Sequence, residues 1–462
     1  MKHKQLLLLL TLLSFNGLYV HAQQKPNFIL IVADDLGYAD LSLTGSKQIN
    51  TPNIDRLAFE GVNFTQGYVS APVCSPSRAG FLTGRNQVHF GHDNNLSVSP
   101  LPGFDPKYFG LPLSETTIAD RLKKLGYVTG LVGKWHLGYD PQFHPTKRGF
   151  DEFWGYTGGG HDYFKSEPEG KGYMSPIECN YKTAQPITYI TDDKGDECVD
   201  FIKRHKKEPF FLFASFNAPH GPLQATEEDL KLFEDIEDKK RRTYLAMIHR
   251  LDVNVGKILN TVKKEGLDKN TLIVFISDNG GPISNGSLNA PYNGKKGILL
   301  EGGIHVPYIM KWTGRIPAKK TYEEPVISLD FAATFFEEAG GKITDDVKLD
   351  GVNLIPYITG EKEGIPHEAF NWRFTISAAI REGDWKLIRL PDRLPILYNL
   401  SEDISEQDDV SLQNMDKTKA MLKKLGDWDV RLPHPYFLEG QNFKAIQLDS
   451  YDDSYQLEQP ER

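Results

Sequence analysis

Four short, mainly apolar runs in the chain each end abruptly at polar side chains. The runs cover residues 27–33, 127–132, 210–216 and 271–276 and are rich in aliphatic, β-branched and aromatic residues. Runs of this kind are typical of strands that are buried on both faces of a sheet. The polar residues that follow them include Asp34, Lys134, His220 and Asp278.

Helical patterns lie between these runs. The clearest covers residues 244–259, where apolar side chains recur every three or four positions and predict one buried helix face. Strands that alternate with helices predict an α/β fold with a doubly wound, mostly parallel sheet. Ligands bind beyond the carboxyl ends of the strands in such sheets. The polar residues after the four runs are therefore predicted to share one site.

Two segments depart from this alternation. Residues 157–198 are rich in Gly, Asp, Glu, Lys and Pro, which predicts a long, partly irregular insertion near the site. After residue 350 the pattern becomes short and amphipathic, as at 378–390 and 397–400, and predicts a smaller antiparallel α+β subdomain closed by a helix. We expect a catalytic α/β domain over residues 23–350 and a C-terminal subdomain over residues 351–462, with a mobile acidic tail from residue 449.

The first residues of the chain have the features of a signal peptide. An apolar run at residues 6–13 follows Lys2 and Lys4 and leads to Val-His-Ala at residues 20–22, a small-x-small pattern that signal peptidase cleaves. We expect residues 1–22 to be removed on export to the periplasm or the extracellular space. The run is shorter than the roughly 20 residues that a membrane span needs, so no transmembrane segment is expected.

Charge and cysteine content narrow the function further. The net charge is −9 and becomes more negative once Lys2 and Lys4 are removed, which argues against nucleic acid as a partner. An anionic substrate would have to be held by local positive charge. Three cysteines in an exported chain leave one unpaired or chemically special. If that one is Cys74, then Cys179 and Cys198 form either a disulfide or two free thiols.

The sharpest local signal is Cys-Ser-Pro-Ser-Arg at residues 74–78, followed by Leu-Thr-Gly-Arg at 82–85. This signature resembles that of the type I sulfatases, which belong to the alkaline phosphatase superfamily. The resemblance extends over nearly the whole mature chain through Asn-Phe-Ile-Leu (27–30), Asp-Asp-Leu-Gly-Tyr (34–38), Thr-Pro-Asn-Ile-Asp (51–55), Gly-Lys-Trp-His-Leu-Gly (133–138), Asn-Ala-Pro-His (217–220), Ser-Asp-Asn-Gly (277–280), Trp-Lys-Leu-Ile (385–388) and Leu-Tyr-Asn-Leu (397–400).

The resemblance implies an alkaline phosphatase-like fold and a secreted bacterial sulfatase acting on a sulfated polysaccharide or glycosaminoglycan fragment. It also implies that a dedicated maturation enzyme converts Cys74 to formylglycine. A hydrated aldehyde offers one hydroxyl to attack sulfur and a second to expel sulfate, whereas an ordinary thiol would end as a thiosulfate. Because a sulfate ester is anionic, the reaction also needs positive charge around the transferring group.

An oxygen-rich set of side chains follows two of the predicted strands. Asp34 and Asp35 follow the first, and Asp278 and Asn279 follow the last. Hard oxygen donors favour Ca²⁺ or Mg²⁺ over zinc. The resemblance implies that these four residues bind calcium together with a hydroxyl made from Cys74, and that the metal lowers the pKa of that hydroxyl.

The resemblance also assigns roles to four basic residues. Arg78 is expected to stabilise the hydrated residue 74, and Lys134 is expected to bind sulfate oxygens. His220 is expected to protonate the leaving alcohol, and His136 to take the proton whose removal triggers sulfate release.

The resemblance implies a second sulfate-binding lysine at residue 295 or 296. The family pattern places lysine directly before glycine, which points to Lys296, but Asn-Gly-Lys-Lys at residues 293–296 departs from the usual Arg-Gly-Gly-Lys and leaves Lys295 open. His161 and Asp162 follow three glycines, and His92 follows the Leu-Thr-Gly-Arg stretch. These three either line the substrate pocket or are ordinary loop residues.

Two other functions compete with this interpretation. A phosphonate or phosphate monoester hydrolase of the same superfamily can also use formylglycine, although its phosphatases generally add a second metal with histidine ligands, and the sequence offers no such set. A catalytically silent glycan-binding protein is the second alternative. The complete set of Cys74, the two histidines and the four oxygen ligands argues against it.

Overall fold

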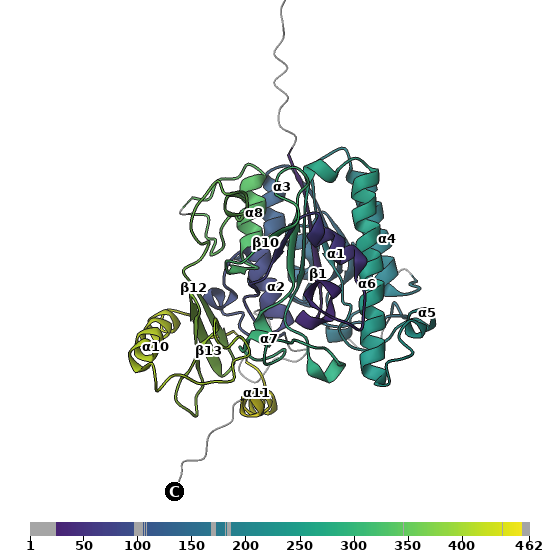
Figure 1. Cartoon of the computed structure of the whole chain (residues 1–462). Coiled ribbons are helices and arrows are strands. Elements are labelled where there is room, and N and C mark those ends of the chain that lie inside the picture. Colours follow the sequence, from purple (N-terminus) through teal and green to yellow (C-terminus); the bar gives the residue numbers. More distant parts are fainter. Residues whose placement is uncertain are drawn as a thin grey trace, which may run out of the picture.

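A sheet of nine strands forms the centre of the molecule (Figure 1). The structure is a computed structural model that describes residues 25–96, 105, 107, 109–167, 172–180, 182, 186–344, 346–436 and 438–454. The expected signal peptide at residues 1–22 lies outside them. The strands, in their order across the sheet, are β10 (Lys320–Tyr322), β2 (Val62–Phe64), β9 (Tyr308–Lys311), β8 (Thr271–Ser277), β1 (Asn27–Ala33), β7 (Phe210–Ser215), β4 (Val128–Lys134), β5 (Glu152–Tyr156) and β6 (Glu178–Cys179).

The four predicted strands are confirmed as β1, β4, β7 and β8. Together with β5 they form a block of five neighbouring parallel strands. Antiparallel strands β9 and β6 adjoin the two sides of this block. The side chains of β1, β7 and β8 are buried along their whole length, as expected for strands that are covered on both faces.

Helices cover both faces of the sheet, as the doubly wound prediction requires (Figure 1). One apolar core lies between the sheet and helices α1 (Pro52–Phe59), α4 (Ile190–His205) and α6 (Lys239–Lys264). The other lies under α2 (Cys74–Thr83), α3 (Ile118–Lys124) and α8 (Asp330–Glu338). The short helices α5 (Glu227–Lys231), α7 (Glu301–Ile304) and α9 (Ile355–Thr359) and the strand pair β3 (Gly67–Tyr68) and β11 (Val326–Ile327) complete this part of the chain.

The predicted irregular insertion at residues 157–198 is shorter than expected. Residues from Ile190 onward already belong to the 16-residue helix α4. The polar composition of the segment did not predict this helix, because two of its polar or small residues make buried contacts with other parts of the chain. Lys194 is fully buried against Asn217, and Gly195 packs so tightly on Asn254 that an added Cβ would lie 2.0 Å from Oδ1.

The predicted C-terminal antiparallel sheet is confirmed. It contains β12 (Ala369–Phe374), β13 (Ser377–Glu382), β14 (Trp385–Arg389) and β15 (Ile396–Asn399), and helix α10 (Met415–Asp429) packs on it. The sheet begins at Ala369, while the domain boundary expected at residue 350 stays a prediction.

Residues 449–454 of the tail predicted to be mobile have helical structure, while its mobility stays a prediction. They belong to helix α11 (Gln441–Ser454). The helix docks through polar and aromatic contacts. Tyr451 is 1% exposed, belongs to the apolar core and accepts a hydrogen bond from the amide of Leu299, and Phe443 packs on Phe374. The sequence of this helix has no apolar periodicity that would predict such a contact.

The strand register brings the polar strand ends together. Ala33 of β1 lies beside Ser277 of β8, and Ser215 of β7 lies beside both Val32 of β1 and Gly133 of β4. The four strands therefore end at the same level, and the residues that follow them meet at one edge of the sheet.

Candidate active site

An acidic cluster forms directly after β1 and β8. The backbone of Asp35 is left-handed, with φ of 65°, which turns the chain sharply after the strand. Its amide donates a hydrogen bond to Asp278 Oδ1 at 3.2 Å, and its Oδ1 accepts one from Asn279 Nδ2 at 2.7 Å. Asp34, Asp35, Asp278 and Asn279 are all nearly inaccessible to solvent, so the predicted oxygen set is assembled in one place.

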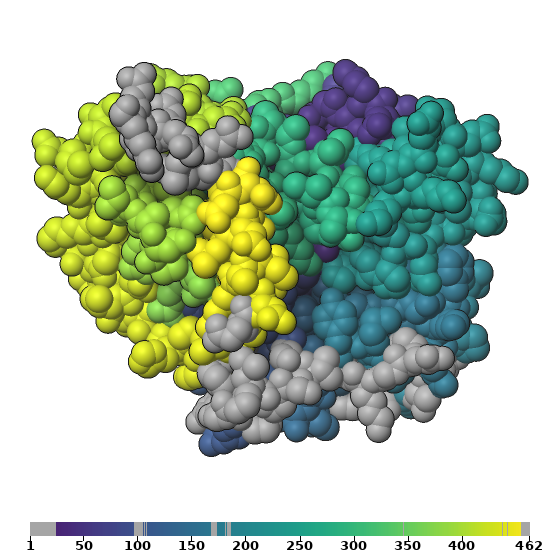
Figure 2. Space-filling view, turned by 90° about the horizontal axis from the view of Figure 1, so that it is seen from below, coloured from purple at the N-terminus to yellow at the C-terminus, as the bar shows by residue number. Residues whose placement is uncertain are grey.

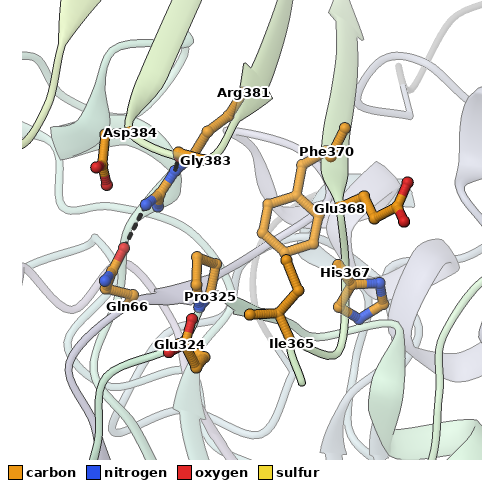
Figure 3. Close-up of a pocket in the computed structure, with 11 residues that line it drawn as sticks. Gln66, Glu324, Pro325, Ile365, His367, Glu368, Phe370, Arg381, Gly383 and Asp384 are labelled. Carbon is orange, nitrogen blue, oxygen red and sulfur yellow. Dashed lines mark hydrogen bonds between the residues drawn. The ribbon is translucent and has the colours of Figure 1, made fainter.

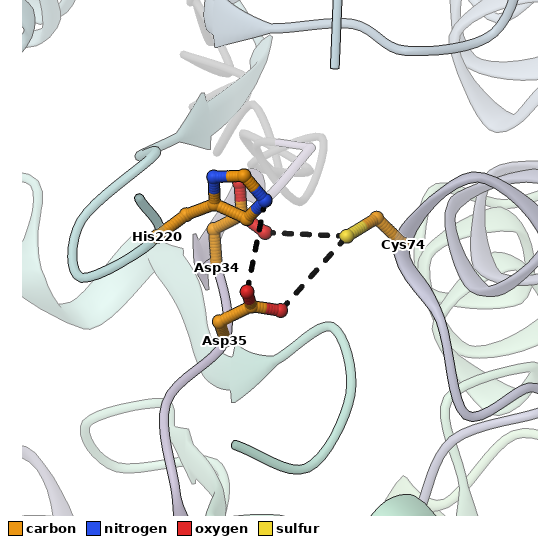
Figure 4. A group of neighbouring side chains, drawn as sticks. All are labelled: Asp34, Asp35, Cys74 and His220. Carbon is orange, nitrogen blue, oxygen red and sulfur yellow. Dashed lines mark hydrogen bonds and ion pairs between the residues drawn. The ribbon is translucent and has the colours of Figure 1, made fainter. Parts of the chain in front are cut away.

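Cys74 points into this cluster from the first residue of helix α2 (Figure 4). Its Sγ lies 3.4 Å from Asp34 Oδ1 and 4.0 Å from Asp35 Oδ1. One ligand atom from each of Asp34, Asp35, Cys74 and His220 lies within 4.8 Å of the others. The residue singled out by the sequence motif thus faces the carboxylates that the sequence proposed as metal ligands.

Arg78 follows Cys74 by four residues and therefore lies on the same side of α2. Its guanidinium contacts Asp278 Oδ2 through Nε at 2.9 Å and Nη2 at 2.8 Å. Nη1 donates to Ser215 Oγ at 2.7 Å. These contacts fix a fully buried positive charge behind the nucleophile position.

Two lysines complete the positive side of the site. The ammonium of Lys134 lies 2.7 Å from Asp34 Oδ2. The ammonium of Lys296 lies 2.6 Å from Asp35 Oδ1 and 3.2 Å from Cys74 Sγ. Among the described residues it is Lys296, rather than Lys295, whose side chain makes these contacts, so the structure favours the alternative that the sequence preferred.

The two predicted histidines lie close to the same cluster. His220 Nδ1 donates to the carbonyl oxygen of Gly221 at 2.6 Å, while its Nε2 lies 3.6 Å from Asp35 Oδ2. His136 has a left-handed backbone with φ of 58°, and neither of its buried ring nitrogens has a hydrogen-bond partner among the residues described. Tyr173 contacts both histidines. Its ring and that of His136 pack edge to face, and its hydroxyl lies 3.4 Å from His220 Nε2.

Burial and charge set the protonation of these groups. Burial raises the pKa of the Cys74 thiol to about 12, although the neighbouring lysines oppose the shift. A thiol with this pKa stays protonated near neutral pH and is a poor nucleophile. Burial also drives the pKa of His136 well below its ordinary value, assisted by the charges of Lys134 and Arg78. The neutral imidazole can accept a proton.

Asp34 and Asp278 share the positive charges unequally. Burial opposes ionisation of Asp34, but the cations around it, Lys134 first, hold its pKa well below the usual range. Burial and the charge of Asp34 instead raise the pKa of Asp278 to about 6. The two carboxyls therefore titrate as a pair.

The donor chemistry of the cluster fits a hard divalent cation. Three carboxylates and one amide converge, and the Oδ1 atom of Asn279 is buried with no hydrogen-bond partner in the part of the chain that is described. An unsatisfied buried oxygen on a side chain that contacts Asp35 suits Ca²⁺ or Mg²⁺, which prefer oxygen ligands. Zinc would favour nitrogen or sulfur donors. The group offers one of each, from His220 and Cys74, beside the carboxylates of Asp34 and Asp35.

Comparison with known proteins decides the family. The family model for sulfatases matches residues 26–341, which is more than half of the chain. The chain belongs to the sulfatase family. It is accordingly a sulfuric ester hydrolase. A second family model, described as the C-terminal part of N-sulphoglucosamine sulphohydrolase, matches residues 294–428 of the sulfatase.

Individual relatives agree with this assignment. The sulfatase is 35% identical over 405 residues to N-acetylgalactosamine-6-sulfatase of Mus musculus, covering 83% of this chain and 75% of the relative. Ps i-CgsB, solved in complex with k-i-k-neocarrahexaose, is 38% identical with a TM-score of 0.84 and matches over 93% of this chain and 98% of its own. A phosphonate monoester hydrolase of Agrobacterium radiobacter shares the fold, with 20% identity, a TM-score of 0.62, and coverage of 88% of this chain and 95% of its own.

Two contributors to the site of the sulfatase were missed in the sequence. Ser215 is the last residue of β7, so the rule that strand ends carry the site could have found it. Tyr173 lies in a single 3₁₀ turn, Gly172–Met174, inside the irregular segment. No spacing or motif in that segment marks it.

The three residues suggested as substrate contacts make contacts within the protein. His92 is fully buried, and its Nε2 lies 2.7 Å from Ser75 Oγ behind the start of α2. His161 is also fully buried and packs on Tyr156, with Nδ1 2.6 Å from the carbonyl of Asp162. The carboxylate of Asp162 caps the amides of the next turn and binds Gln224. A role of these residues in substrate binding stays a prediction.

Other features of the sulfatase lie away from the site. Cys179 and Cys198 are free thiols, so the disulfide alternative is absent from the described structure. A small pocket of about 100 Å³ lies at the seam with the C-terminal sheet (Figure 3). Arg381 lines this pocket, and its guanidinium donates hydrogen bonds to Gln66 Oε1 and to the carbonyl oxygen of Gly383. No helix among the described residues is long and apolar enough to cross a membrane.

Proposed function

We propose that this sulfatase removes sulfate from a sulfated polysaccharide or glycosaminoglycan fragment, with formylglycine made from Cys74 as its nucleophile. The main support for this proposal is the position of Cys74, whose Sγ lies 3.4 Å from Asp34 Oδ1 and 3.2 Å from Lys296 Nζ. The substrate class is supported by the names of its relatives, an N-acetylgalactosamine-6-sulfatase and a protein solved with neocarrahexaose.

Formylglycine would supply a hydrated aldehyde with one hydroxyl to attack sulfur and one to expel sulfate. The unmodified side chain is poorly suited to this work, because burial keeps the Cys74 thiol protonated. The chain supplies the surroundings. Arg78 is fixed by Asp278 and Ser215 and presents positive charge behind residue 74. Lys134 and Lys296 lie where they can bind the oxygens of an incoming sulfate group.

Calcium, or magnesium in its place, would neutralise substrate charge and lower the pKa of the nucleophilic hydroxyl. Asp34, Asp35, Asp278 and Asn279 would hold it together with residue 74. The Oδ1 atom of Asn279, which has no hydrogen-bond partner among the described residues, supports this ligand set.

The two histidines divide the proton transfers. His220 has its Nδ1 hydrogen committed to a carbonyl, so Nε2 is the atom that can carry a proton to the leaving alcohol. Burial lowers the pKa of His220, and the negative charge of a bound sulfate ester would raise it again. His136, neutral and without partners among the described residues, suits the role of the base that assists sulfate release.

A phosphonate or phosphate monoester hydrolase remains the competing activity. The likeness to the phosphonate monoester hydrolase concerns the fold alone. Among the described residues, one group of candidate metal ligands is present, and a second histidine-rich group is not. This favours sulfate over the two-metal phosphatase chemistry of the superfamily.

Maturation and export follow from the same proposal. A formylglycine-generating enzyme would act on Cys74, and the predicted signal peptide would direct the chain to the periplasm or the extracellular space.

The decisive experiment assays the purified mature protein against a panel of sulfated saccharides and aryl phosphonates, with mass spectrometry of the peptide that contains residue 74. We expect sulfate release and an aldehyde at residue 74, both lost in Cys74→Ala. Full activity with an unmodified thiol would exclude the nucleophile, and turnover of phosphonates alone would exclude the sulfatase activity.

A further inference from the structure

The last described part of the chain crosses the face of the molecule that contains the site. Figure 2 shows this face, with helix α11 in yellow between the C-terminal subdomain and the catalytic domain. Helix α11 begins at Gln441, beyond the end of both matching family models. Membership of the family therefore assigns no role to it.

Helix α11 is bonded to the loop that carries Lys296. Gln447 Nε2 donates to the carbonyl oxygen of Gly297 at 2.8 Å, and the amide of Leu299 donates to the Tyr451 hydroxyl at 2.8 Å. Gln447 is 2% exposed and Tyr451 is 1% exposed. Two buried polar side chains, four residues apart on one helix face, thus hold the main chain on the carboxyl side of Lys296.

The backbone of the Lys296 loop adopts a glycine-dependent conformation. Gly294 and Gly297 flank the lysine, both with positive φ, of 89° and 93°, and glycine permits many other conformations at such positions. Directly at Lys296 the main chain is held by two hydrogen bonds: the amide of Gly297 donates to the carbonyl of Pro72 at 2.9 Å, and the amide of Lys296 donates to the carbonyl of Gly281 at a long 3.4 Å. On either side, the amide of Ile298 donates to the carbonyl of Lys295 at 3.3 Å, and Asn289 Nδ2 donates to the carbonyl of Gly294 at 3.2 Å.

The same C-terminal segment also reaches the nucleophile side of the site. Glu439 Oε1 accepts a hydrogen bond from the amide of Asn95 at 3.3 Å. Asn95 Oδ1 in turn accepts one from the amide of Ser75 at 3.0 Å. Ser75 directly follows Cys74, so the segment connects the start of α2 with the lysine loop.

We propose that Glu439, Gln447 and Tyr451 form a C-terminal clamp that sets the position of Lys296 relative to residue 74. The three are positioning residues that act through Lys296 and α2 without contacting substrate. This inference rests on the proposed role of Lys296 in sulfate binding. Displacement of a catalytic group by about 1 Å can cost on the order of 100-fold in rate, so loosening the clamp should impair turnover although the site itself is unchanged.

The test variant is Gln447→Leu combined with Tyr451→Phe, which removes both hydrogen bonds to the loop and keeps similar side-chain volumes. We expect kcat/KM for an aryl sulfate to fall about 10- to 100-fold and inhibition by inorganic sulfate to weaken by a similar factor. Asp449→Asn, on the exposed side of the same helix, is the matched control and should leave both unchanged.

A double-mutant cycle separates positioning from general loss of stability. In a Lys296→Met background the clamp variant should cause little further loss, because both changes act on the same interaction. Full additivity, or a clamp variant with normal kcat/KM and normal sulfate inhibition, overturns the proposal. If the clamp variant with both Gln447→Leu and Tyr451→Phe does not fold, the single substitution Tyr451→Phe, which removes one hydroxyl, replaces it in the same cycle.

Failure of the clamp and failure of the proposed function give different results. If the wild-type protein cleaves no sulfate ester, the proposed function fails, and the clamp is then tested by the shift in Tm that inorganic sulfate causes in wild type and clamp variant. Equal shifts overturn the clamp, and a smaller shift in the clamp variant supports it.

Discussion

Lys296→Met is the most informative single substitution, because the chain supplies its own control in the neighbouring Lys295→Met. Both changes remove one positive charge and keep a long unbranched side chain. Only Lys296 contacts the site, with its ammonium 2.6 Å from Asp35 Oδ1 and 3.2 Å from Cys74 Sγ. The two variants therefore differ in the position of the lost charge and in little else.

The expected magnitude follows from the surroundings of the ammonium. The side chain of Lys296 is 17% exposed, so its field is screened less than that of a surface lysine. Two unit charges about 4 Å apart interact by about 4 kcal/mol at an effective dielectric constant of about 20. Loss of one preorganised donor to a developing charge typically costs about 10²- to 10³-fold in rate. We expect kcat/KM to fall within this range for Lys296→Met and less than about threefold for Lys295→Met.

The assay measures kcat/KM with an activated aryl sulfate and inhibition by inorganic sulfate for both variants, after mass spectrometry has confirmed equal conversion of residue 74. Weaker inhibition by sulfate should accompany the loss of rate in Lys296→Met. A larger loss for Lys295→Met, or equal small losses for both, would refute the assignment of Lys296 as a sulfate ligand.

Three further changes test other parts of the structure. His220→Ala should impair sugar sulfates about 10²- to 10⁴-fold and activated aryl sulfates much less, because a good leaving group needs no proton; equal losses in steady-state kinetics would contradict its role as acid. Asn279→Ala should abolish the rise in Tm that calcium causes in the wild type; an undiminished rise would exclude it as a ligand. Lys386→Met should lower the free energy of unfolding by about 3–5 kcal/mol in urea titrations, because the buried ammonium of Lys386 lies 2.8 Å from carboxylate oxygens of both Glu301 and Glu406. The control Lys423→Met, at an exposed lysine, should lower it by less than about 1 kcal/mol. Burial raises the pKa of Glu406 to about 7, so the contribution of this carboxyl group to the free energy of unfolding is complete below about pH 4.5 and is lost as the pH rises through 7. If the stability lost in Lys386→Met became smaller towards pH 8, this linkage would be contradicted.

The parts of the site that follow strands could be predicted from the sequence. Parallel strands end at one edge of the sheet, and the register of β1 and β8, with Ala33 beside Ser277, places Asp34 and Asp278 directly after neighbouring strand ends. This rule uses only local apolar patterns and a general property of parallel sheets. Local patterns alone can therefore predict that residues more than 200 positions apart in the chain, such as Asp34 and Asp278, share one site.

Helices that bury polar or small residues beside apolar ones escaped the same reasoning. Helix α4 buries Lys194 and a glycine that permits close approach to α6. Helix α11 buries Gln447 beside Tyr451 and Phe443. Hydrophobic periodicity is the primary signal for a helix in a sequence, and it is weak where the buried face is polar. Tyr173 was missed for a related reason, since a residue in an irregular segment has no periodicity to place it.

The charge balance of the site explains how an acidic protein can bind an anion. Three carboxyl groups and three basic groups meet around residue 74, namely Asp34, Asp35, Asp278, Arg78, Lys134 and Lys296. With all six ionised their charges cancel, and protonation of Asp278, whose pKa is raised to about 6, would add one positive charge. A bound divalent cation would leave an excess of two. Because the pair interactions are buried, salt screens them weakly, so a local positive field can persist in a chain with a net charge of −9. Selection of sulfate esters then depends on contacts within a few ångströms of residue 74 and owes little to long-range attraction.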